Sequence, residues 1–299
     1  MPELRWVGID QGYSQMGLAV LDARGQVLAS AQSRGPVGNG HDREVALARL
    51  VRLLAAVDGL RHAPVRLAGY CYQHSGVCEA FAEAGWTVLG VKALNDVMGV
   101  YGLTEMHGHV LVAGCGTFSQ VVYVDDQQAV RWPGDDVTEQ LPEWLLSGGA
   151  YARFVVDSAR QQTGAPTADP MRRVAEVLGA VPAEPTPPHW AKLGPILSGM
   201  VDAPATRAFV RQAGASVIAT RDVFWRNLAT VQPPDVVLGG GAVRDARLWA
   251  LLAEQWRAQG ARVTRAVGDP AVGLARFAMS YPEADAWAVI GHRRPAWLQ

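Results

Sequence analysis

The chain has 299 residues, of which 49% are hydrophobic and 18% charged, and its formal net charge is −1. This length allows two domains of ordinary size, and the composition is typical of a globular protein with a sizeable core. The balanced charge provides no basic surface for nucleic acid, and no window is long and apolar enough to span a membrane. Since no signal peptide precedes the first apolar run, we expect a cytoplasmic protein with neither nucleic acid nor membrane as a partner.

The first hundred residues alternate between apolar runs of strand length and segments with helical spacing. Strands are predicted at about 4–10, 16–22, 27–33, 65–69 and 86–91. Helices are predicted at about 41–58, 77–84 and 95–101. Short turns would join the first three strands into a meander, whereas the later alternation of strand and helix is typical of βαβ crossovers and of a mixed sheet with a parallel part.

The second part of the chain repeats this pattern. A second meander is predicted at about 109–131, followed by a mostly helical region at about 140–230 that a proline-rich connection interrupts. A strand, a glycine turn and a helix at about 235–258 complete the second copy. The repeat predicts two similar α/β domains, roughly residues 1–105 and 106–299, and the last helix, at about 272–290, could pack back on the first domain.

Three of the predicted strands end in turns of small residues. These turns contain Gly12, Tyr13 and Ser14; Gly114, Gly116 and Thr117; and Gly239, Gly240 and Gly241. Glycine at such a turn lets backbone N–H groups face a phosphate, because no side chain blocks the approach. The three turns together indicate a nucleotide held between two similar halves. The third turn alone is weak, because glycine runs between a strand and a helix are common in α/β proteins that bind no nucleotide.

The order of these motifs resembles that of the actin-like ATPase superfamily, whose fold is ribonuclease H-like. Within it, the chain is most similar to the N-acetylglucosamine kinase-like branch, also called BadF/BadG/BcrA/BcrD-type ATPases. The resemblance covers nearly the whole chain. Its motifs are a first phosphate turn at 8–16, an Asn-Asp helix at 95–102, a second phosphate turn at 113–117, an adenosine motif at 239–241 and a small-residue helix start at 269–275.

This resemblance implies a fold and an activity. The fold would be two duplicated α/β domains with an interdomain cleft, and the activity that of an ATP-dependent sugar kinase. It would transfer a phosphoryl group from Mg-ATP to a hydroxyl of an amino sugar, such as N-acetylglucosamine or glucosamine, or of a related hexose. The implied cofactors are therefore ATP and Mg²⁺, and the implied partner is a small-molecule sugar. Assembly into a homodimer is left open.

The resemblance also assigns roles to individual residues. Asp10 would hold Mg²⁺, and Asp96 would be the general base that deprotonates the acceptor hydroxyl, assisted by Asn95. The first two turns would hold the phosphates and the third the adenosine, while Gly38 and Asn39 would face the sugar. Each assignment has a simpler alternative: Asp10 could cap its own turn, Asp96 could be an N-cap, and Asn39 could belong to a plain loop.

The chain departs from the family pattern at several positions. Tyr13, Gln15 and Met16 replace the usual glycine, lysine and second threonine of the first phosphate motif, and Cys115 replaces a threonine of the second. The acidic stretch that recognises sugar in the family has no carboxylates near 146–151. Two further functions therefore remain open. One is a partner-driving ATPase similar to the activators of 2-hydroxyacyl-CoA dehydratases, although the cysteines for their iron–sulfur cluster are missing. The other is a non-catalytic binder of nucleotide or sugar.

Overall fold

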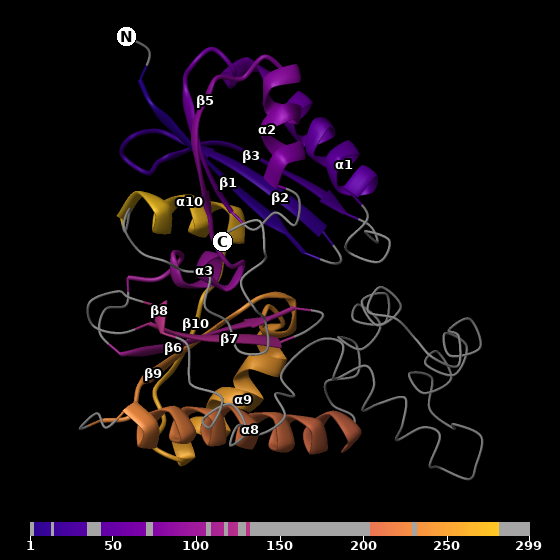
Figure 1. Cartoon of the computed structure of the whole chain (residues 1–299). Coiled ribbons are helices and arrows are strands. Elements are labelled where there is room, and N and C mark those ends of the chain that lie inside the picture. The colour runs from indigo at the N-terminus through magenta and orange to yellow at the C-terminus, as the bar shows by residue number, and fades with distance from the viewer. Residues whose placement is uncertain are drawn as a thin grey trace, which may run out of the picture. The chain divides into compact units, whose positions relative to one another are not determined.

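The structure is a computed structural model that describes residues 3–12, 15–34, 43–69, 74–105, 109–116, 119–124, 130–131, 204–228 and 232–280. These residues divide into two units (Figure 1). The first unit lies within 1–112, 121–132 and 266–299, and the second within 113–120 and 133–265. The domain boundary near residue 105 and the interdomain cleft stay predictions.

The first sheet has the strand order β3-β2-β1-β4-β5. Its strands are β1 (Arg5–Gln11), β2 (Gln15–Leu21), β3 (Val27–Arg34), β4 (Val65–Gly69) and β5 (Val88–Ala93). The first three strands pair antiparallel as a meander, whereas β4 runs parallel to β1 and β5 parallel to β4. The meander and the parallel part predicted from the sequence are therefore confirmed.

Helices cover both faces of this sheet, as the first unit in Figure 1 shows. One face, with Val7 and Ile9, packs against α1 (Arg43–Ala56) and α2 (His74–Glu83). The other face packs against α10 (Pro270–Ser280), whose Ala271 and Ala275 form a second apolar cluster with β2. Because successive residues of a strand point to opposite faces, Gly8 and Asp10 lie on the α10 side.

Glycines bring α10 close to its neighbours. A Cβ on Gly8 would lie 1.8 Å from the carbonyl oxygen of Ala271, so no larger residue fits between β1 and α10. The short helix α3 (Val97–Tyr101) packs on α10 in the same way, because a Cβ on Gly273 would lie 1.8 Å from the carbonyl oxygen of Gly99. The helix α10 therefore contacts both β1 and α3 at backbone distance.

The second sheet has the order β10-β9-β6-β7-β8. Its strands are β6 (Val110–Cys115), β7 (Ser119–Val124), β8 (Val130–Arg131), β9 (Asp235–Gly239) and β10 (Val263–Arg265). In each sheet the three strands of the meander lie side by side, and the two later strands extend the sheet beyond the first strand of the meander. This common order confirms the predicted repeat. The sequence did not predict β10, because three residues are too few to show an alternating pattern.

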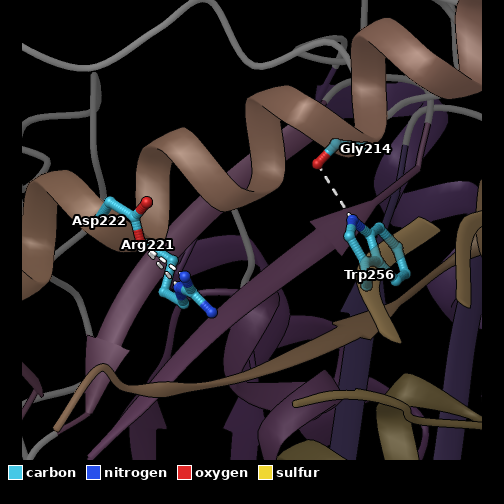
Figure 2. A network of polar contacts seen from close by, with 4 residues as sticks. All are labelled: Gly214, Arg221, Asp222 and Trp256. Carbon is cyan, nitrogen blue, oxygen red and sulfur yellow. Dashed lines mark hydrogen bonds and ion pairs between the residues drawn. The ribbon is translucent and has the colours of Figure 1, made fainter. Parts of the chain in front are cut away.

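Two helices of the second unit pack on each other, namely α8 (Pro204–Leu228) and α9 (Ala246–Ala258). The indole N–H of Trp256 on α9 donates a hydrogen bond of 3.0 Å to the carbonyl oxygen of Gly214 on α8 (Figure 2). Further along α8, Arg221 donates to the carboxylate of Asp222 at 2.7 Å. Of the helical region predicted at about 140–230, α8 confirms the last part, whereas residues 140–203, with the proline-rich connection, lie outside the described residues.

Candidate active site

Asp10 stands next to the end of β1 and is 8% exposed. Its cross-strand partner on β2 is Gly17. A Cβ on Gly17 would lie 3.8 Å from the Cβ of Asp10 and 3.2 Å from Oδ1 of Asp269, which precedes α10. The absence of a side chain at Gly17 therefore leaves room for two carboxylates on one face of the sheet.

The turn after Asp10 connects β1 to β2. The N–H of Gly12 donates a hydrogen bond of 2.9 Å to the carbonyl oxygen of Gln15 and closes this turn. Tyr13 and Ser14, which were predicted to contact phosphate, lie outside the described residues. Met16 is 1% exposed and belongs to the core on the opposite face from Asp10, so its difference from the family pattern alters packing on the α1 side.

Asn95 and Asp96 follow β5. The N–H of Leu94 donates to the carbonyl oxygen of Gly69 at 3.0 Å, which extends the pairing with β4 to the residue before this pair. The N–H of Val97 is 3.0 Å from Oδ1 of Asn95 and 3.0 Å from Oδ1 of Asp96. Asp96 is therefore the N-cap of α3, which is the simpler alternative of the sequence analysis, and the cap also fixes where its carboxylate lies.

Burial changes the acidity of Asp96. It raises the pKa of this carboxyl from 3.8 to about 6, and the smaller effect of the Val97 N–H, which stabilises the ionised form, opposes the rise. A carboxylate with this pKa is mostly ionised at neutral pH and is a stronger base than an ordinary aspartate. The electrostatics of the position therefore suit proton abstraction.

The topology of the first sheet places Asp10 and Asp96 at the same edge. Strands β1, β4 and β5 are parallel neighbours, and Asp10 lies near the carboxyl end of β1 as Asp96 follows the carboxyl end of β5. In open α/β sheets, ligands bind outside the carboxyl ends of the parallel strands. The same edge is bordered by α10, which contacts β1 and α3.

The glycine turns of the second unit come together at the ends of β6 and β9. Gly240 has φ 103°, and a Cβ there would lie 2.7 Å from the carbonyl oxygen of Cys115. Gly114, Gly116 and Gly239 belong to the same two chain segments, whereas Thr117 lies outside the described residues. A Cβ on Gly241 would meet nothing within 4 Å. The close contact with Cys115 thus explains why position 240 is a glycine, whereas the space beside the backbone of Gly241 is open.

Cys115 is fully buried in this turn, and burial raises the pKa of its thiol well above the ordinary value. A thiol that stays protonated is a poor nucleophile, so the position does not suit Cys115 for nucleophilic chemistry. Within the described ranges, no three His, Cys, Asp or Glu residues cluster as metal ligands. A magnesium ion bound mainly through phosphate oxygens needs only one or two carboxylates, so Asp10 fits that ion.

Two of the positions predicted to face the sugar cannot be placed, and two described residues beside the site were not predicted. Gly38 and Asn39, predicted to face the sugar, lie outside the described residues. The sequence motifs assign no role in the site to Asp269 or Gln32. Asp269 opens the small-residue motif at 269–275, and aspartate followed by proline is a typical helix start, but neither signal indicates its bond to Gln32. Among the described helices, none has the length and the hydropathy of a membrane-spanning segment.

The comparisons with known proteins support the fold. No family model and no curated protein matches the sequence. Among solved structures, a Porphyromonas gingivalis protein provisionally named an N-acetylglucosamine kinase has a TM-score of 0.68 at 15% identity, covering 93% of this chain and 99% of its own. A ROK family glucokinase from Streptomyces griseus, in complex with glucose and AMPPNP, has a TM-score of 0.62 at 14% identity, with coverages of 91% and 97%.

A third solved structure extends this agreement. It is another provisionally named N-acetylglucosamine kinase, from Chromobacterium violaceum, with a TM-score of 0.60 at 18% identity and coverages of 92% and 98%. At such identities the likeness concerns the fold and leaves the reaction open. The chain has the actin-like ATPase fold of sugar kinases, as the order of its motifs predicted.

Proposed function

We propose that the chain is an ATP-dependent sugar kinase that phosphorylates a hydroxyl of an amino sugar or a related hexose. The observation that carries this proposal is the placement of Asp10 and Asp96 at one edge of a sheet with the fold of sugar kinases. Phosphoryl transfer requires charge neutralisation, in-line positioning and a group that accepts the hydroxyl proton. The two carboxylates can supply the first and the third of these requirements.

Asp10 is the residue proposed to hold Mg²⁺. The ion would neutralise charge on the phosphates of ATP when bound. Asp10 is a buried carboxylate near the end of a strand, its cross-strand partner is Gly17, and the turn after it contains Gly12. Tyr13 and Ser14 are proposed to hold phosphate oxygens with their backbone N–H groups. Gly12, whose own N–H closes the turn, is proposed to let the phosphate approach the backbone.

Asp96 is the proposed general base. It would accept the proton of the acceptor hydroxyl while that oxygen forms a bond to the γ-phosphorus. The bond from the γ-phosphorus to the bridging oxygen breaks, and ADP leaves with the electron pair of that bond. A pKa of about 6 suits this step, because the base is ionised at neutral pH and still basic enough to take the proton. Asn95 is proposed to orient the acceptor by hydrogen bonding.

The second unit is proposed to bind the nucleotide. Gly114, Gly116 and Thr117 would contact phosphate, and Gly239, Gly240 and Gly241 would let adenosine approach the backbone. The observation that supports adenosine binding here is the open space at Gly241, next to the packed contact between Gly240 and Cys115. The structure of the S. griseus glucokinase with AMPPNP supports nucleotide use in this fold.

An amino sugar is the preferred acceptor because two of the similar structures are named as N-acetylglucosamine kinases. The glucokinase keeps glucose-like hexoses in the set to be tested. Gly38 and Asn39 remain the proposed sugar-facing residues, and a cytoplasmic location remains part of the proposal.

A non-catalytic binder is the second candidate function. It rests on the departures at Tyr13, Gln15 and Met16 from the family pattern. The burial of Met16 in the core weakens this alternative, because a residue there does not face the side of the sheet on which Asp10 lies. Such a binder would hold ATP without releasing ADP when sugar is added.

The deciding experiment measures ADP release from Mg-ATP across a panel of amino sugars and hexoses. Wild type and Asp96→Asn are compared, since asparagine keeps the cap of α3 and removes the base. We expect sugar-dependent turnover in the wild type and a loss of about 10²-fold or more in the variant. Nucleotide binding without turnover of any sugar would instead support the non-catalytic binder.

A further inference from the structure

Asp269 makes two hydrogen bonds that join distant parts of the first unit. Its Oδ1 accepts from the N–H of Ala271 at 3.0 Å and caps the start of α10. Its Oδ2 accepts from Nε2 of Gln32 on β3 at 3.2 Å. The side chain therefore links the first turn of α10 to the meander.

The start of α10 lies beside both proposed catalytic carboxylates. On one side, Oδ1 of Asp269 occupies the space over Gly17, the cross-strand partner of Asp10. On the other side, the carbonyl oxygen of Pro270 lies 2.6 Å from where a Cβ on Gly99 would be, three residues after Asp96. A shift of this helix start would move the surroundings of both carboxylates.

We propose that Asp269 is a positioning residue, which through its bonds to Ala271 and Gln32 holds the start of α10 where it sets the spacing of Asp10 and Asp96. This inference rests on the proposed kinase function and adds a residue to it. In this role Asp269 contributes its two hydrogen bonds, to Ala271 and Gln32, and its negative charge is not required. Misplacement of catalytic groups by about 1 Å is enough to cost a large part of the rate.

Three variants separate shape from charge. Asp269→Ala removes both hydrogen bonds. Asp269→Asn keeps an oxygen for the Ala271 N–H and an amide that can pair with the Gln32 amide, but it removes the charge. Asp22→Ala is the matched control, because Asp22 also accepts backbone N–H groups, from Arg24 and Gln26, at the turn on the other end of β2.

Turnover is measured with the acceptor that the sugar panel identifies. We expect Asp269→Ala to lower kcat by about tenfold or more while the KM values for ATP and acceptor stay within about threefold, because binding groups remain and alignment is lost. Asp269→Asn and Asp22→Ala should keep kcat close to that of the wild type. An unchanged kcat in Asp269→Ala would overturn the proposal, and so would an Asp269→Asn variant as impaired as Asp269→Ala.

Binding of ADP with and without Mg²⁺, measured by calorimetry, gives a readout that needs no turnover. The gain in ADP affinity on adding Mg²⁺ should fall by about fivefold in Asp269→Ala and stay unchanged in Asp269→Asn, because Asp10 is displaced only in the former. A wild type that binds Mg-ADP but phosphorylates no acceptor would contradict the proposed kinase function. The gain in ADP affinity on adding Mg²⁺ would then still test the positioning role of Asp269. A full gain in Asp269→Ala would overturn its positioning role.

Discussion

At the scale of single residues, Asp96 is both the cap of a helix and the proposed general base. Its carboxylate caps α3 through the Val97 N–H, and burial makes it a stronger base than an exposed aspartate. Burial that favours the protonated form also makes the ionised state costly to keep in the folded protein. A base prepared in this way should therefore be visible both in the pH dependence of the reaction and in the stability of the fold.

The pH dependence of turnover should follow the ionisation of Asp96. The base is active when ionised, and its pKa is raised to about 6, so kcat/KM should fall as the pH drops below that value. The fall should approach about tenfold per pH unit, as expected for the loss of one ionised group. The measurement is a pH profile of kcat/KM, with Asp96→Asn as the control whose residual rate should lack this limb. A flat profile between about pH 5 and pH 7 would contradict the role of Asp96 as base.

Removal of the Asp96 charge should lower activity but raise the stability of the fold. The folded state holds the Asp96 proton more tightly than the unfolded chain, so stability is lost as the pH rises from 3.8 through about 6. Asp96→Asn avoids this loss and should be more stable than the wild type at about pH 8, by about 2 kcal/mol more than at about pH 4.5. Urea unfolding at both pH values gives the comparison, with Asp22→Asn as a surface control. An equal difference in the free energy of unfolding at both pH values would mean that the folded state does not raise the pKa of Asp96.

The residues that the sequence motifs assign to the proposed site share one property, namely that each belongs to a local pattern of neighbouring residues. Asp10 stands before a glycine turn, and Asn95 with Asp96 precedes a helix, so each belongs to a local motif. The hydrogen bond between Gln32 and Asp269 joins residues 237 positions apart, and no local sequence pattern predicts it. The pKa of Asp96 was equally out of reach, because it depends on what buries the carboxyl.

At the scale of elements, the contact between β1 and α10 depends on Gly8. Alanine there would place a Cβ 1.8 Å from the carbonyl oxygen of Ala271, and both partners are backbone. Gly8→Ala should cost about 3 kcal/mol or more, because the helix must move away from the sheet. Gly90→Ala is the matched control on β5, where a Cβ meets nothing within 4 Å, and it should change stability by less than about 1 kcal/mol. Chemical unfolding of both variants tests the difference, and equal stabilities would contradict the close contact.

The turn after β9 allows a similar comparison. Gly240 has φ 103° and lies against the backbone of Cys115, whereas Gly260 has φ 68° with nothing within 4 Å of its Cβ position. Both alanine variants carry backbone strain, but only Gly240→Ala should also move the glycine turn. We therefore expect ADP affinity to fall by about tenfold in Gly240→Ala and to stay unchanged in Gly260→Ala, since backbone shifts near a ligand cost affinity. Equal affinities in calorimetry would separate this turn from nucleotide binding.

Element boundaries show what the sequence could and could not predict. Long apolar runs gave β1, β2 and β4 close to their observed bounds, because their periodicity extends over the whole strand. The start of α10 was predicted two residues late, although Asp269 and Pro270 are the usual cap and first residue of a helix. The strand β10 depends on pairing with β9, so its signal lies in the fold rather than in its own three residues.

At the scale of the whole molecule, both sheets repeat one order of strands. In the first sheet the meander is followed by β4 and β5, and in the second by β9 and β10. The proposed site residues follow the same repeat, because a glycine turn stands after the first strand of each sheet. The duplication could be predicted from the repeated pattern, and the similar structures support it over more than nine-tenths of the chain.

If the chain binds nucleotide as proposed, bound Mg-ADP should stabilise the molecule. A ligand at about one hundred times its Kd adds about 2.7 kcal/mol, which should raise Tm by about 5 °C in a chain of this size. Mg²⁺ alone should have little effect, because Asp10 provides one carboxylate and the remaining ligands would be phosphate oxygens and water. Asp10→Asn should therefore lose the part of the shift that depends on Mg²⁺ and keep the part that ADP causes with a chelator present. A thermal shift series measures these parts separately. A shift with Mg²⁺ alone would mean that the metal binds without nucleotide, and a Mg²⁺-dependent shift that Asp10→Asn leaves intact would place the metal away from Asp10.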